Sequence, residues 1–145
     1  MGYSINKKQY KDFIVYALNT GFDDEESAKD HLEYLVKLFN KLPDTIKLYR
    51  LVFLSKKSDL REKELGSHYV LEKKTLIKNH YDVMLYNYSE FEDSKPYVMV
   101  VETPKNKIDF YETIRNNLAY PNEQEITLKD KGKGIKLISL DRFFR

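Results

Sequence analysis

The chain has 145 residues, which fits one domain and leaves no room for a second core of similar size. Apolar residues make up 41% and charged residues 33%, a balance too apolar for a disordered chain and too polar for a membrane protein. The net charge of +2 provides no global field that would attract nucleic acid, and the absence of cysteine excludes disulfides, thiolate metal sites and cysteine nucleophiles. We therefore expect a single globular domain over residues 1–145.

The helical part, residues 1–44, is predicted to contain two helices. Between residues 5 and 18 apolar residues recur every three or four positions, which is the helical period, and a glycine follows as the stop. A capping-box pattern of Asp23 and Glu26 begins a second helix over residues 24–42. We expect its apolar stripe to pack on the β-region through Leu32, Leu35 and Phe39.

The β-rich part, residues 45–145, contains β-branched and aromatic residues in short runs. These runs predict strands at residues 47–54, 67–71, 81–86, 97–101, 123–128 and 135–140. Short helices are expected at residues 73–79 and 105–114, and the glycines of residues 131–134 predict a hairpin between the last two strands. N-terminal helices followed by a mostly antiparallel sheet make an α+β fold.

The strand at residues 47–54 carries one arginine, Arg50, among apolar neighbours. Burying an unpaired guanidinium is costly, so Arg50 needs an anionic partner. Two partners fit. A protein carboxylate would make Arg50 part of a structural ion pair, whereas a ligand phosphate would be held by the planar fork of the guanidinium.

Two acidic residues, Glu123 and Glu125, lie on the late strand at residues 123–128. Alternate residues of a strand share a face, so these carboxylates and Thr127 would lie together. Two neighbouring carboxylates perturb each other's pKa when the face is secluded from water. A solvent-exposed strand face shows the same alternation, so the pattern fits both a catalytic pair and plain surface.

A hydroxyl, an imidazole and a phenol follow one another in Ser67, His68 and Tyr69, directly after Gly66. This set of side chains is suited to the lining of a cleft. It also fits a loop that leads into a core strand, with Tyr69 half buried and His68 hydrogen-bonded at the surface. The segment alone leaves both interpretations open.

Metal binding and membrane insertion are not expected. His31, His68 and His80 show no ligand spacing with one another, so we predict no metal site. No apolar run reaches about 18 residues, and no signal-peptide core follows Met1. This predicts a cytoplasmic protein without a membrane partner.

Taken in order, the arginine strand, the strand that follows Gly66 and the late Glu-x-Glu strand resemble the three-part signature of ADP-ribosyltransferases of the arginine–serine–glutamate class. Residues 48–50, 65–69 and 121–126 are similar to those of small bacteriophage-encoded proteins assigned to this fold. The resemblance covers residues 48–140. It implies a split antiparallel β-sheet with NAD bound in a cleft.

The resemblance implies a role for each motif. Arg50 would contact the phosphate or ribose of NAD, and Glu125 would stabilise the positive charge that develops on ribose as nicotinamide departs. Glu123 would orient or deprotonate the acceptor. Tyr69 or Tyr111 would stack on nicotinamide. The expected NAD-binding residues are thus Arg50, Ser67, His68 and Tyr69.

The middle motif departs from the family pattern. Members usually show Ser-Thr-Ser, or an aromatic residue followed by Thr or Ser, where this chain has Ser67, His68, Tyr69 and Val70. If Ser67 takes the place of the first serine, it keeps a hydrogen bond to Glu125. If Val70 takes that place, the glutamate has no orienting partner. The motif therefore leaves an active and an inactive site open.

Three functional hypotheses follow from the sequence. The first is an NAD-dependent mono-ADP-ribosyltransferase that modifies a host protein or another macromolecule. The second is a catalytically inactive interaction module that keeps the fold and binds a host factor. The third is a nucleotide or nucleic-acid binder that uses Arg50 and the lysines of residues 131–136, which the near-neutral charge disfavours.

Overall fold

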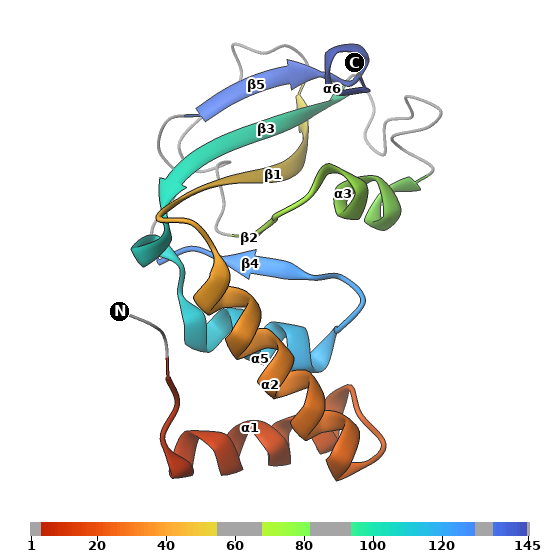
Figure 1. Cartoon of the computed structure of the whole chain (residues 1–145). Helices are drawn as coiled ribbons and strands as arrows, with labels where there is room; N and C mark the ends of the chain where they lie inside the picture. Colours follow the sequence, from red (N-terminus) through yellow and green to blue (C-terminus); the bar gives the residue numbers. More distant parts are fainter. Residues whose placement is uncertain (1–3, 55–67, 82–93, 130–134, 145) are drawn as a thin grey trace.

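The computed structural model describes residues 4–54, 68–81, 94–129 and 135–144 (Figure 1). Its elements, in chain order, are α1 (Lys7–Thr20), α2 (Glu25–Lys41), β1 (Thr45–Leu54), β2 (His68–Val70), α3 (Lys73–Asn79), β3 (Lys95–Pro104), the 3-10 helix η3 (Lys105–Lys107), α5 (Phe110–Ala119), β4 (Glu125–Thr127), β5 (Ile135–Ser139) and α6 (Leu140–Phe144). No helix in the described ranges is both long and apolar enough to cross a membrane.

The described strands form one sheet in the order β4-β2-β1-β3-β5, and every neighbouring pair is antiparallel. The predicted α+β class is therefore confirmed. The predicted hairpin between the last two strands is wrong, because β4 and β5 lie at opposite edges of the sheet. Glycines permit a tight turn but do not choose the strand partner, and β5 pairs with β3 from Tyr97↔Ser139 to Val101↔Ile135. Residues 131–134 themselves lie outside the described residues.

The sheet opens between β1 and β2. β1 pairs with β3 along its whole length, from Thr45↔Pro104 to Leu54↔Lys95, but it shares only the pair Tyr49↔Val70 with β2. Figure 1 shows β1, β3 and β5 together at one end of the molecule, with β4 between them and α5. β2 therefore leaves β1 and continues the sheet with β4.

The main core lies between the helices and one face of the sheet. Leu32, Leu35 and Phe39 of α2 are at most 3% exposed and belong to the same buried cluster as Leu48 and Val52 of β1. This confirms the predicted packing of α2. A smaller cluster joins β2, α3, β3 and α6. It consists of Val70, Leu76, Val98, Leu140 and Phe143.

Several predicted boundaries are corrected. The helix expected at residues 105–114 is divided into η3 and α5, since Asp109 caps α5 by accepting a hydrogen bond from the Glu112 amide. The strand expected at residues 135–140 ends at Ser139, where α6 begins. Of the strand expected at residues 81–86, Tyr81 is helical and the remainder lies outside the described residues.

Candidate functional site

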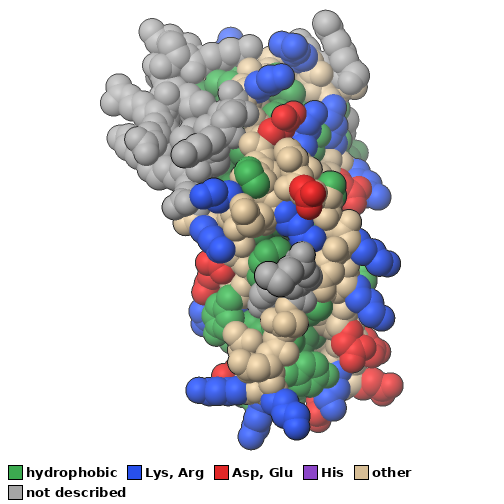
Figure 2. Space-filling view, turned by 60° about the vertical axis from the view of Figure 1, so that its left-hand side comes forward, with side chains coloured by type: hydrophobic (Ala, Val, Ile, Leu, Met, Phe, Trp, Pro, Cys, Tyr) green, Lys and Arg blue, Asp and Glu red, His purple; other side chains and the backbone are tan. Residues whose placement is uncertain are grey.

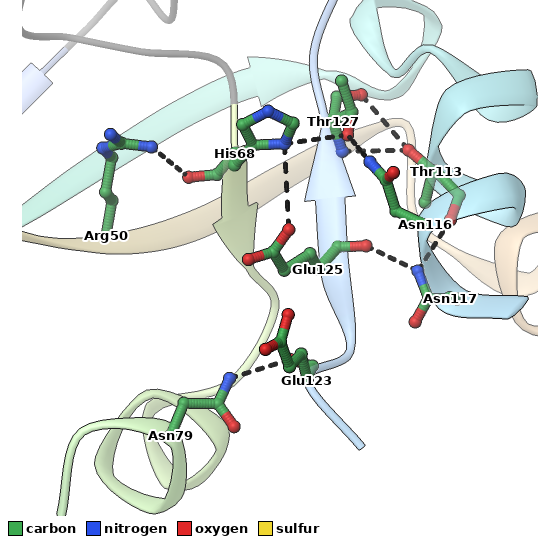
Figure 3. A network of polar contacts seen from close by, with 9 residues as sticks. All are labelled: Arg50, His68, Asn79, Thr113, Asn116, Asn117, Glu123, Glu125 and Thr127. Atoms are coloured by element: carbon green, nitrogen blue, oxygen red, sulfur yellow. Dashed lines mark hydrogen bonds and ion pairs between the residues drawn. The ribbon is translucent and has the colours of Figure 1, made fainter. Parts of the chain in front are cut away.

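A polar pocket of about 200 Å³ lies where β1 and β2 separate. It brings together four predicted site residues, Arg50, His68, Tyr69 and Glu125, which come from three different strands; Figure 3 draws Arg50, His68 and Glu125. The described residues of the lining come from β1, β2, α3 with the residue that follows it, and β4: Tyr49, Arg50, Leu51, His68, Tyr69, Val70, Leu76, Asn79, His80 and Glu125.

Arg50 reaches this pocket because the ladder between β1 and β2 stops beside it. Continued pairing from Tyr49↔Val70 would place Leu51 opposite His68, but within the described part of the two strands no such pair is formed. Instead, Nη1 of Arg50 donates a hydrogen bond to the carbonyl oxygen of His68 over 2.9 Å. The side chain of Arg50 thus links β1 to β2 beside their register pair Tyr49↔Val70.

The guanidinium of Arg50 retains an unused donor. Its Nε is buried and has no hydrogen-bond partner within the described part of the chain. In residues 4–54, 68–81, 94–129 and 135–144, no carboxylate lies within ion-pair distance of Arg50. Of the two partners considered from the sequence, a protein carboxylate is therefore not found within the described residues.

Glu125 is half buried at the start of β4. Its backbone carbonyl accepts a hydrogen bond from Nδ2 of Asn117 over 2.7 Å, which ties the strand to α5. Burial raises the pKa of the Glu125 carboxyl; the charge of His68 opposes this rise, the charge of Glu123 adds to it, and Arg50 opposes it. The carboxyl group therefore lies in an environment that is less polar than water but contains two basic groups.

Glu123 comes close to Glu125 through a turn and not through strand alternation. The strand predicted at residues 123–128 begins only at Glu125, because Gln124 has a φ of 53°. Nδ2 of Asn79 donates a hydrogen bond of 2.8 Å to the Glu123 carbonyl oxygen, and Thr75 Oγ1 donates to Oε1 of Gln124 over 3.1 Å. Figure 3 shows the exposed Glu123 side chain turned toward Glu125.

The His68 ring contacts two side chains of β4. Its Nδ1 lies 3.2 Å from Oγ1 of Thr127 and 3.8 Å from Oε2 of Glu125. The Thr127 hydroxyl in turn accepts a hydrogen bond of 3.1 Å from Nδ2 of Asn116 on α5. His68 is therefore part of a polar network that links three elements, as Figure 3 shows.

Sequence reasoning missed the polar face of α5. Thr113 and Asn117 are 0% and 3% exposed, and they hold the backbone of β4. The Thr127 amide donates to Thr113 Oγ1 over 2.9 Å, while Asn117 binds the carbonyl of Glu125. The available signal was a pair of polar residues four positions apart, of which Asn117 lies beyond the end of the helix predicted at residues 105–114.

Other expected site residues are placed differently. Tyr69 is 1% exposed and its side chain belongs to the main core, which does not fit stacking on nicotinamide or a half-buried position. Tyr111 lies on α5 with its ring 5.1 Å from that of Phe13, and it does not line the pocket. Ser67 lies outside the described residues. Val70 is 4% exposed and sits directly opposite Glu125 in the strand register.

Comparisons with protein-family models, with curated proteins and with solved structures returned no match. The chemistry of the pocket therefore has to be inferred from its residues. A guanidinium with an unused donor can bind an anionic group. A half-buried carboxylate a short distance away can stabilise a developing positive charge.

Proposed function

We propose that the chain is an NAD-dependent mono-ADP-ribosyltransferase of the arginine–serine–glutamate class that modifies a protein or another macromolecule in the cytoplasm of a host cell. The observation that carries this proposal is the meeting of Arg50 and Glu125 in one pocket. The two residues come from β1 and β4, which are not neighbours in the sheet. The opening between β1 and β2 also supports the split sheet expected for this family.

In this proposal Arg50 binds the pyrophosphate of NAD. A planar guanidinium suits phosphate oxygens, and no protein carboxylate of the described ranges competes for it. The pocket of about 200 Å³ is smaller than the roughly 300–1,000 Å³ of typical ligand sites. We therefore assign to it the nicotinamide–ribose end of NAD, where the reacting bond lies, with the phosphates beside Arg50.

The proposed reaction breaks the bond between C1′ of the ribose and the nicotinamide nitrogen. The electron pair leaves with nicotinamide, which becomes neutral, and positive charge develops on the ribose. The ionised carboxylate of Glu125 stabilises that charge. A nucleophile of the acceptor then forms a bond to C1′ and gives its proton to Glu123, from which it passes to water.

One observation favours a second candidate, the catalytically inactive module that binds a host factor. Val70 pairs directly with Glu125 across the strands, and its apolar side chain is buried in the smaller core cluster. It therefore offers no hydrogen bond to the carboxylate. Among the described residues no comparable observation favours a nucleic-acid binder, since side chains of both charges are interspersed over the coloured part of the face shown in Figure 2.

Thermal melts with and without NAD test the proposal. At about 1 mM NAD the melting temperature of the wild type should rise by several degrees, because a ligand that binds only the native state stabilises it by mass action. Arg50→Ala should remove the rise. Lys47→Ala is the matched control, because Lys47 is an exposed cation of the same strand whose ammonium pairs with Glu102 at 3.8 Å.

Two results of these melts would contradict the proposal. One is a wild-type protein that is folded but shows no shift at millimolar NAD, which favours the interaction module. The other is an equal shift in wild type and Arg50→Ala, which removes Arg50 from the binding of NAD.

A further inference from the structure

We infer that His68 is a positioning residue: its imidazole, with Nδ1 3.8 Å from Oε2, attracts and orients the carboxylate of Glu125, so that His68 acts through Glu125 and not as a ligand of NAD. This inference rests on the proposed function, because it assigns the orientation of the proposed catalytic carboxylate.

The strand register places His68 within reach of Glu125. β2 and β4 pair His68 with Thr127 and Val70 with Glu125, so His68 and Glu125 are diagonal neighbours on one face. Long side chains bridge such diagonal positions in antiparallel pairs. The separation of 3.8 Å between Nδ1 and Oε2 shows that these two side chains do so.

The imidazole ring is itself anchored from α5. Asn116 donates to the Thr127 hydroxyl over 3.1 Å, and that hydroxyl lies 3.2 Å from Nδ1 of His68. The hydroxyl keeps one proton and one lone pair after accepting from Asn116, so it can serve either tautomer of the ring. Asn117, the next residue of α5, binds the carbonyl oxygen of Glu125. One helix thus fixes both the ring and the residue that the ring contacts.

The contacts of His68 favour positioning over ligand binding. Its carbonyl oxygen accepts from Arg50, and its Nδ1 faces Thr127 and Glu125. A positive charge on the ring attracts the carboxylate and opposes the effect of burial on the Glu125 pKa. His68 therefore favours the ionised form of Glu125, which is the form that the proposed reaction needs.

The first test uses two substitutions whose side chains hold their amide groups at different distances from the backbone. The amide of His68→Asn places a polar atom where Nδ1 stands, whereas the amide of His68→Gln reaches the position of Nε2. In steady-state assays of nicotinamide release, His68→Gln should lower kcat about ten-fold or more with little change in KM for NAD, and His68→Asn should keep most of kcat. Equal losses in both variants, or a higher KM with unchanged kcat, would overturn the inference.

The second test needs no turnover. The Glu125 carboxyl is titrated by carbon NMR in the wild type and both variants without NAD, and its signal is assigned by its absence in Glu125→Gln. Loss of the imidazole should raise the Glu125 pKa by about half a unit or more in both variants. An unchanged pKa overturns the inference. If the wild type releases no nicotinamide, the proposed function fails, while this titration still decides whether His68 and Glu125 are paired.

Discussion

At the scale of single residues, the site depends on where each charge is held. Arg50 lies in β1 between Tyr49 and Leu51, and its guanidinium donates a hydrogen bond to the carbonyl oxygen of His68. Burial is the main cause of the raised pKa of the Glu125 carboxyl. A carboxyl group with a raised pKa and a guanidinium that line the same pocket are features of functional sites.

The raised pKa of Glu125 predicts how its substitution affects stability. The folded protein binds the proton more tightly than the unfolded chain, so the stability that this group adds is complete at low pH and is lost as pH rises through the folded pKa. Glu125→Gln should therefore melt at or above the wild-type temperature at about pH 7.5, and the difference should vanish at about pH 4. A control is Glu33→Gln, at an exposed position of α2. A marked loss of stability at neutral pH in Glu125→Gln would contradict this assignment.

Glu123 is expected to act on the acceptor and not on NAD. Glu123→Gln should leave the hydrolysis of NAD by water nearly unchanged but lower the transfer of labelled ADP-ribose to macromolecules of a lysate by about ten-fold or more. Both rates are measured on the same preparation, with Glu102→Gln as an exposed control. If hydrolysis and transfer fall in parallel, Glu123 acts on NAD and not on the acceptor.

At the scale of elements, α5 is the support of the site. It holds β4 through Thr113 and Asn117, and it is itself packed against α1 and α2. The end of α1 approaches the end of α5 closely at Gly21, where a Cβ atom would collide with the carbonyl oxygen of Leu118 and lie 2.9 Å from that of Ala119. Only glycine allows the two backbones to come this near.

This close approach predicts the effect of Gly21→Ala. The added methyl group has to push α1 away from α5, which should lower the free energy of unfolding by roughly 1–3 kcal/mol. Lys11→Ala, at an exposed position of α1, should change it by less than about 0.5 kcal/mol. Urea unfolding of both variants measures the two values. Equal stability of Gly21→Ala and the wild type would show that the contact is absent in solution.

Local patterns in the sequence predicted those parts of the fold that depend on interactions between residues close together in the chain. The apolar stripe of α2 was predicted from helical periodicity, whereas a shared site for Arg50 and Glu125 was expected from the resemblance to ADP-ribosyltransferases. The turn at Gln124 was not predicted, because its positive φ occurs without a glycine. The edge position of β5 depends on which strand pairs with it. The glycines of the preceding connection do not indicate that strand. The role of α5 in holding β4 could not be predicted from the sequence, because it depends on which strand lies beside this helix in the fold.

At the scale of the whole molecule, the proposed site lies where β2 separates from β1 and pairs with β4. β1 belongs with β3 and β5, β2 belongs with β4, and one register pair joins the two groups. Helices α1, α2 and α5 lie at the end of the molecule away from β5, while α3 contributes to the pocket (Figure 1). The fold thus separates two strands at one point and places a cation on one side of the opening and a carboxylate on the other.

The release of nicotinamide from NAD is the measurement that tests this account most directly. Purified wild type and the Glu33→Gln control should release nicotinamide at equal rates. Glu125→Gln should be slower by about 100-fold or more, since it lacks the charge that stabilises the cationic ribose in the transition state. Equal rates in wild type and Glu125→Gln would contradict the account, as would a folded wild-type protein that releases no nicotinamide even with a lysate as the source of acceptor.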